Sequence, residues 1–352
     1  MLSFVTYSDP HLKLLLWVGL AIVGVTMLLL VQTILLRMQL IMRQRREQRL
    51  VERWQPLFAQ SMTALPQSLP PIAKSDWDAF LRLWNNTQET LSGELKHKLN
   101  QLAWACGVSH VAQQLLSHKN MRKRLLAVAT LGHLQEKNAW SRLRNLTDDP
   151  HPLLSLAAAR ALMQIDAKAA LADLLPLFTH RHDWPLNKIA KMMNEAGPDA
   201  VSGPLTQAVE IAAAEDFPRL VRLLDCAHSE QALPAIRRIL QSAADDRVIS
   251  ACLQALSDPE DVGVARTYTR HPSWFVRVQA VSALGRIGSR EDRDTLIAPL
   301  SDSVWWVRYR AAQALAGLPQ VTLDEVRQIR DKINDRFAKD ILTQVIAEKQ
   351  AA

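Results

Sequence analysis

Two stretches near the end of the chain carry one pattern, 31 residues apart: His271-Pro-Ser-Trp-Phe-Val-Arg-Val-Gln-Ala-Val-Ser-Ala-Leu-Gly285 and Asp302-Ser-Val-Trp-Trp-Val-Arg-Tyr-Arg-Ala-Ala-Gln-Ala-Leu-Ala316. The apolar residue near the end of the pattern recurs along the chain, at Leu131, Leu162, Met193, Leu224, Leu256, Leu284 and Leu315. The residues one and four positions before it are mostly small or apolar, and such positions share one face of a helix. The spacing predicts a repeated helix with one apolar stripe.

A second column of mostly apolar residues follows twelve positions later and predicts a second helix in each repeat. Its members are Leu143, Leu174, Leu205, Ile236, Tyr268 and Leu296. A single helix pair cannot bury its apolar stripe, whereas stacked pairs bury it against one another. The predicted fold is therefore an all-α solenoid of about seven to eight helix pairs with a period of about 31 residues.

The motifs Val276-Arg277-x-x-Ala280-x-x-Ala283-Leu284-Gly285 and Val307-Arg308-x-x-Ala311-x-x-Ala314-Leu315 resemble the HEAT repeat, in the short bacterial form also found in phycobilisome lyases. The resemblance covers roughly residues 118–330, and residues 76–116 are expected to form a divergent capping repeat. It implies a HEAT-like solenoid with an extended concave surface lined mainly by the second helices. The motif arginine is kept at Arg124, Arg277 and Arg308, and is replaced by Ser155, Leu186, Phe217 and Ile249.

A run of 23 uncharged residues, Leu14 to Leu36, lies near the start of the chain. About 20 apolar residues of helix cross the hydrocarbon core of a bilayer. Six arginines follow within 17 residues: Arg37, Arg43, Arg45, Arg46, Arg49 and Arg53. Basic residues beside a span stay on the cytoplasmic side. We therefore expect a single-pass inner (plasma) membrane protein, with its N-terminus outside and its solenoid in the cytoplasm.

A cleaved signal peptide is the alternative for this segment, but it carries its positive charge before a shorter apolar core and a small-residue cleavage site after it. We therefore expect a retained anchor. The predicted domains are an N-terminus and transmembrane helix at 1–36, a basic juxtamembrane helix and proline-containing linker at 37–75, and the solenoid at 76–352. Trp54, just past the arginines, is expected to lie at the membrane interface as an anchor.

The net charge of +7 would suit a nucleic-acid-binding protein, but residues 37–53 alone contribute +4. We therefore attribute the excess positive charge to membrane topology and to contact with anionic lipid headgroups, and we expect no nucleic-acid partner. The three cysteines are isolated, and no catalytic motif is present. His180-Arg181-His182-Asp183 lacks a third ligand at metal-binding spacing. We expect no catalytic, cofactor or metal site, and no small-molecule substrate is evident.

The candidate partner-binding residues are Trp274, Arg277, Trp305, Trp306 and Arg308. Tryptophan and arginine dominate interface hot spots, but the competing interpretation is that these tryptophans pack between stacked repeats. The two arginines are expected to pair with nearby acids such as Asp302, as in the Asp–Arg ladder of the HEAT family. The charge runs at 245–247 and 290–294 are expected to be solvated helix caps.

The predicted function is a membrane-anchored, non-enzymatic scaffold whose cytoplasmic solenoid binds a protein partner, itself membrane-associated. By analogy, an envelope, polysaccharide-synthesis or secretion assembly would suit it. The alternative is a bilin lyase-like HEAT protein with an enzymatic or chromophore-holding role.

Overall fold

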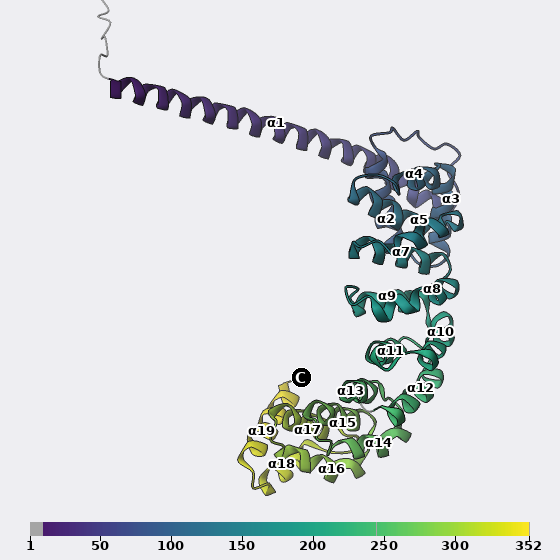
Figure 1. Ribbon diagram of the computed structural model, residues 1–352, viewed down its shortest axis with the longest axis vertical. Helices are drawn as coiled ribbons and strands as arrows, with labels where there is room; N and C mark the ends of the chain where they lie inside the picture. The colour runs from purple at the N-terminus through teal and green to yellow at the C-terminus, as the bar shows by residue number, and fades with distance from the viewer. Residues whose placement is uncertain (1–9, 244, 352) are drawn as a thin grey trace, which may run out of the picture. The chain divides into compact units, whose positions relative to one another are not determined.

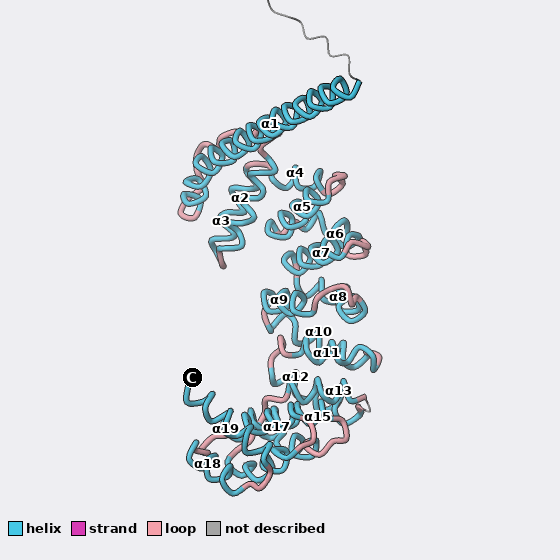
Figure 2. Tube along the Cα trace, turned by 90° about the vertical axis from the view of Figure 1, so that its left-hand side faces the viewer, coloured by secondary structure: helices cyan, strands magenta, loops and turns pink. Residues whose placement is uncertain are grey.

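Helices make up the regular secondary structure of this chain. The computed structural model describes residues 10–243 and 245–351, and within them it contains helices and turns but no strand (Figures 1 and 2). The expected all-α repeat solenoid is confirmed. The chain divides into two compact units, residues 1–134 and 135–352.

Unit 1 begins with a long helix and continues with four shorter ones. They are α1 (Pro10–Ser61), α2 (Trp77–Thr90), α3 (Glu94–Ala105), α4 (Val108–Leu115) and α5 (Met121–Leu134). The apolar segment and the basic segment of the sequence therefore form one continuous helix. The helix ends at Ser61, and Pro66, Pro70 and Pro71 disfavour helix in the segment that follows, because proline lacks a backbone donor and restricts its predecessor.

The last turns of α1 belong to the core of unit 1. Trp54 is 2% exposed, and its ring lies 4.7 Å from the Phe80 ring of α2 in an edge-to-face arrangement. Phe58 and Trp84 are buried in the same cluster. The expectation that Trp54 anchors at a membrane interface is wrong. Its ring fills the space between α1 and α2, which a tryptophan does readily because it buries a large apolar area.

Unit 2 stacks helices in two layers. The first layer contains the helices of the Val-Arg motif pattern: α7 (Pro152–Ile165), α9 (Leu186–Ala196), α11 (Phe217–Leu224), α13 (Asp246–Ala255), α15 (Trp274–Ile287), α17 (Trp305–Gly317) and α19 (Arg336–Ala351). The second layer contains α6 (Trp140–Leu146), α8 (Ala167–His180), α10 (Pro198–Ile211), α12 (Ser229–Ser242), α14 (Val262–Tyr268), α16 (Arg293–Ile297) and α18 (Leu323–Lys332).

Short 3₁₀ turns lead into or extend several of these helices: η1 (Lys137–Ala139), η2 (Ala214–Asp216), η3 (Pro259–Asp261), η4 (Arg290–Asp292) and η5 (Ala298–Ser301). Side chains cap several helix starts. Asp166 accepts a hydrogen bond from the Ala169 N–H at the start of α8, and Thr322 and Glu325 form a capping box at the start of α18. Capping satisfies backbone donors that a helix leaves free in its first turn.

The first-layer helices line the inner side of the curve within unit 2, and the second-layer helices lie on its outer side (Figure 1). The expectation that second helices line the concave side is therefore wrong. The small residues of the motif explain the difference. Ala280 and Ala283 of α15, and Ala311 and Ala314 of α17, are buried where consecutive first-layer helices pack on one another. Closer packing shortens this layer, and the stack curves toward it.

The repeat continues further than the sequence motif indicated. In α19, Ala338, Leu342, Val345 and Ile346 are buried, and Ile346 lies 31 residues after Leu315 of the leucine column. This last helix packs against α17. Its motif arginine is replaced by Lys339, so the pattern was harder to recognise there.

A ladder of arginine–aspartate pairs connects the second layer. Arg237 of α12 pairs with Asp261 at 2.7 Å, and Arg266 of α14 pairs with Asp292 of η4. The Asp261 and Asp292 side chains are 5% and 0% exposed. Asp292 does cap a helix start as expected, because its carboxylate accepts from the Ser289 N–H in a capping box, but it is buried against the preceding repeat and not solvated. Asp245 does cap α13 as expected, because its carboxylate accepts from the Arg247 N–H.

Candidate protein-binding surface

A row of aromatic side chains lies exposed at the starts of the last three first-layer helices. Trp274 of α15 is 45% exposed, Trp305 and Trp306 of α17 are 40% and 53% exposed, and Phe337 of α19 is 64% exposed. Their positions follow the 31-residue period, since Trp274 matches Trp305 and Trp306 matches Phe337. We call these four residues the aromatic row.

The interpretation that these tryptophans pack between repeats is wrong, and helix geometry gives the reason. The buried stripe of α15 begins at Val276, which is fully buried. Successive helix positions turn by about 100°, so the two residues before Val276 point away from that stripe. Trp274 therefore starts its helix on a face that the next repeat does not cover. The same holds for Trp305 and Trp306 ahead of the buried Val307.

Neighbouring rings of α17 hold Trp305 in place. The Trp305 ring stacks on Tyr309 with centroids 5.0 Å apart and an interplanar angle of 9°. It also meets the Trp306 ring edge to face, with centroids 4.7 Å apart. Such contacts restrict side-chain rotation, so less conformational entropy is lost when a partner covers the rings.

The motif arginines lie beside this row and bind backbone carbonyls. The Arg277 guanidinium pairs with the Asp302 carboxylate at 2.7 Å and donates to the His271 and Pro272 carbonyls, each at 2.9 Å. Both partners of the pair are mostly buried, at 14% and 12% exposure. The predicted pairing of Arg277 with Asp302 is confirmed, and it connects α15 to the start of the next repeat.

Arg308 differs from Arg277 in its partners. It donates to the Asp302 and Ser303 carbonyls at 2.7 and 3.2 Å, which are the positions equivalent to those that Arg277 binds. Its guanidinium lies 5.3 Å from the Phe337 ring. Among the residues that the structure describes, no carboxylate lies within ion-pair distance of Arg308. The predicted acid pairing is therefore wrong for Arg308, which instead holds an aromatic ring of the row.

Burial alone would raise the pKa of the Asp302 carboxyl, but hydrogen bonds from Arg277 and from the Val304 N–H outweigh burial and hold that pKa below its ordinary value. Asp302 is therefore a carboxylate at neutral pH, as the pair with Arg277 requires.

The repeat of α7 lacks the motif arginine, and an arginine from elsewhere takes its place. Ser155 occupies the motif position in α7, and Arg181, from the loop after α8, donates to the Ser155 hydroxyl at 3.1 Å and to the Thr147 carbonyl at 3.3 Å. The Trp184 indole N–H also donates to Ser155, at 3.1 Å, and Arg181 lies 5.0 Å from the Trp184 ring. Sequence reasoning missed this substitution because Arg181 lies 26 residues away from Ser155.

The histidine-containing segment 180–183 is explained by the same contacts. Arg181 forms an ion pair with Asp183 at 2.7 Å, which raises the pKa of Arg181 and lowers that of Asp183 through their hydrogen bond. No group of three or more potential metal-ligating side chains occurs among the residues described here. The local geometry is that of a loop joining two repeats.

The six basic-segment arginines lie on α1 in unit 1. Arg46 pairs with Asp76 at 2.6 Å, and Arg45, Arg49 and Arg53 are exposed along one side of the helix. Arg37 is exposed next to the apolar segment, and the side chain of Arg43 lies outside the described residues.

A family model agrees with this repeat architecture. The family model for HEAT repeats matches residues 108–193, 233–316 and 264–347. An engineered protein of known structure is 15% identical, with 82% of this chain and 86% of that chain covered and a TM-score of 0.34. YibA of Escherichia coli is 13% identical, with coverage of 79% and 99% and a TM-score of 0.31.

A designed armadillo repeat protein is 19% identical, with 75% of this chain and 99% of that chain covered and a TM-score of 0.22. No curated protein matches the chain in sequence. The HEAT-repeat matches together cover more than half of the chain, and the chain therefore belongs to the HEAT-repeat family.

Proposed function

We propose that this protein is a membrane-anchored scaffold that binds a protein partner through the aromatic row of its solenoid. The observation that carries the proposal is the exposure of Trp274, Trp305, Trp306 and Phe337 in one periodic row. Large apolar side chains gathered on a surface are typical of interaction sites, and tryptophan is enriched among hot spots. A repeat solenoid supplies the extended frame that such a site needs.

The anchor in this proposal is the first part of α1. One helix among the described residues is long and apolar enough to cross a membrane, and the chain itself buries none of its most apolar stretch. Exposed apolar side chains need a lipid or protein environment, and the arginines that follow Leu36 favour a cytoplasmic solenoid. Anchoring also raises the local concentration of a partner in the same membrane, so a weak contact suffices.

Photo-crosslinking in intact cells tests the partner. A photoreactive residue in place of Trp306 is expected to capture one membrane-associated protein, whereas the same residue in place of Trp104 of α3, which is 48% exposed, is expected not to capture it. A product of equal yield from both positions, or none from Trp306 in folded protein, would contradict the proposed surface.

Membrane placement has its own test. Single cysteines introduced before Leu14 and after Arg53 are expected to react with an impermeant thiol reagent from opposite sides of the membrane. Recovery of the full chain in the soluble fraction would contradict the anchor, whatever the crosslinking shows.

A further inference from the structure

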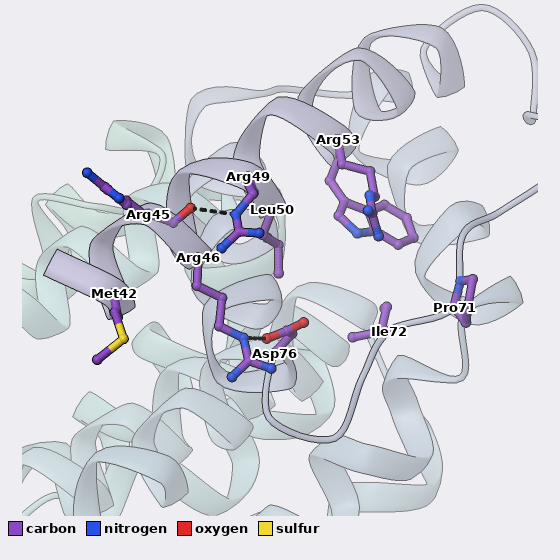
Figure 3. A pocket seen from close by; sticks show the side chains of 10 residues that line it. Met42, Arg45, Arg46, Arg49, Leu50, Arg53, Pro71, Ile72 and Asp76 are labelled. Atoms are coloured by element: carbon purple, nitrogen blue, oxygen red, sulfur yellow. Dashed lines mark hydrogen bonds and ion pairs between the residues drawn. The ribbon is translucent and has the colours of Figure 1, made fainter. Parts of the chain in front are cut away.

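A basic pocket lies at the base of the apolar part of α1, within unit 1. It has a volume of about 550 Å³ and lies between α1 and the chain segment that precedes α2. Four arginines line it, together with an apolar floor and one carboxylate (Figure 3). The lining residues that matter for its chemistry are Arg45, Arg49, Arg53, Leu50, Ile72 and Asp76.

We propose that this pocket binds the phosphate group of an anionic membrane lipid. Arg45, Arg49 and Arg53 are spaced by four residues and therefore lie on one side of the helix. Among the described residues, no carboxylate lies within ion-pair distance of these three side chains. Three uncompensated guanidinium groups beside one cavity favour a ligand with several anionic oxygens, because each guanidinium can bind phosphate oxygens through two N–H groups.

The fourth arginine, Arg46, stabilises the wall of the pocket. Arg46 pairs with Asp76 at 2.6 Å and holds the segment before α2 against α1. Ile72 of that segment packs on the core cluster formed by Trp54 and Phe80. The wall opposite the arginines is therefore fixed by an ion pair and by apolar packing. Basic residues that only set the orientation of the chain in the membrane would need no such wall opposite them.

The depth of the pocket suits a headgroup. Exposed apolar side chains continue past Arg37 to Met42, which is 58% exposed and also lines the pocket. At about 1.5 Å per residue, Arg45 and Arg49 lie roughly 5 and 10 Å beyond Met42 along α1. The headgroup layer extends roughly 5–8 Å beyond the hydrocarbon on each side. On this scale Arg45 lies within the headgroup layer, where a lipid phosphate would meet it, while Arg49 and Arg53 lie farther from the hydrocarbon.

This inference rests on the membrane anchor of the proposed function. Its test uses the full chain, extracted in mild detergent and offered equal amounts of phosphatidylglycerol and phosphatidylcholine, with bound lipid counted by native mass spectrometry. The test variant carries Arg45→Gln, Arg49→Gln and Arg53→Gln. The matched control carries Arg222→Gln, Arg247→Gln and Arg310→Gln, which remove the same charge from exposed positions of unit 2.

The wild-type chain and the control are expected to retain phosphatidylglycerol in preference to phosphatidylcholine, and the test variant is expected to lose that preference by about tenfold or more. Equal retention by all three chains would overturn the proposal. If the wild-type chain binds inorganic phosphate but shows no preference between the two lipids, the pocket is a site for soluble phosphate. That result would overturn the proposal that it binds a lipid.

Membrane fractionation distinguishes a failure of the proposed lipid site from a failure of the proposed membrane anchor. The test variant retains Leu14–Leu36, Arg37 and Arg43, so it is expected to stay in the membrane with its topology unchanged. Loss of lipid preference in a chain that remains inserted therefore concerns the pocket alone. A wild-type chain found in the soluble fraction would contradict the proposed function itself.

Discussion

Gly285 of α15 lies directly against Ala314 of α17. A Cβ at position 285 would come within 2.6 Å of the Ala314 Cβ and 2.8 Å of its Cα. Ala314 lies two positions before Ala316, the residue equivalent to Gly285 in the next repeat, and this contact sets how closely the two first-layer helices approach. The curvature of this end of unit 2 depends on that approach.

Gly285→Ala is expected to destabilise the solenoid, although alanine is the better helix former. The Ala314 backbone must move to admit the methyl group, and overpacking of this kind costs about 1–3 kcal/mol. Gly203→Ala in α10 is the matched control, because a Cβ there meets nothing within 4 Å. It is expected to stabilise by up to about 1 kcal/mol. Thermal unfolding of both variants measures the difference, and an equal rise in both would contradict the close contact.

Asp302→Asn is expected to lower stability at neutral pH by about 1–3 kcal/mol, because Arg277 loses its charged partner in a mostly buried site. The pKa of Asp302 is lower in the folded chain than in the unfolded chain. The pair therefore stabilises fully above the unfolded pKa of about 3.9, and its contribution is lost as pH falls through the folded pKa.

Unfolding midpoints of wild type and Asp302→Asn, measured from neutral pH downward, should accordingly differ most near neutrality and converge in acid. Asp331→Asn serves as the control, since that carboxylate is 66% exposed. A constant difference at every pH would show that the charge of Asp302 is not what stabilises the junction.

Arg181→Ala is expected to loosen the contact between the repeats of α7 and α9. It removes donors from the Thr147 carbonyl and the Ser155 hydroxyl in a partly buried site, at a cost of about 1–3 kcal/mol. Hydrogen exchange of the α7 and α9 amides should accelerate, while exchange in α17 stays unchanged. Arg222→Ala, at an exposed position, is the control. Protection that is equal in both variants would mean that Arg181 does not replace the missing motif arginine.

Trp306→Ala is expected to weaken partner capture by about thirtyfold, the loss typical of a hot-spot residue, without changing the unfolding temperature. Its ring is 53% exposed, so its removal leaves no buried cavity. Trp104→Ala, equally exposed but in unit 1, should leave capture unaffected. Titration of the captured partner measures both. A large loss of stability in Trp306→Ala would show that the residue is structural.

The thiol of Cys252 is expected to resist alkylation in the folded chain. It is fully buried, and burial raises its pKa to about 12. Since the thiolate is the reactive form, labelling at mildly alkaline pH should be slow until the solenoid opens. A chain with Cys106→Ser and Cys226→Ser isolates this thiol, and the labelling rate in rising urea reports the opening of α13. Labelling at the rate of a free thiol in the absence of urea would contradict the buried position.

The repeat could be read from the sequence because its cause is local. The leucine column, the small residues before it and the second column all follow from the 3.6-residue period of a helix. They can therefore be recognised in the sequence without knowing how the helices pack. The uncharged run from Leu14 to Leu36 is equally visible, because length and polarity alone define it. The pairing of Arg277 with Asp302 followed from a motif that recurs in the family.

Other features depended on which surfaces come together. Composition does not distinguish Trp54, which is buried against Phe80, from Trp306, which is exposed, because both are tryptophans in helices. The side of the curve taken by each layer follows from how near neighbouring backbones approach, as at Gly285 and Ala314. Sequence periodicity therefore determined which residues share a helix face. Only the packed structure decided which face a neighbouring helix covers, since burial depends on contacts between residues distant in the chain.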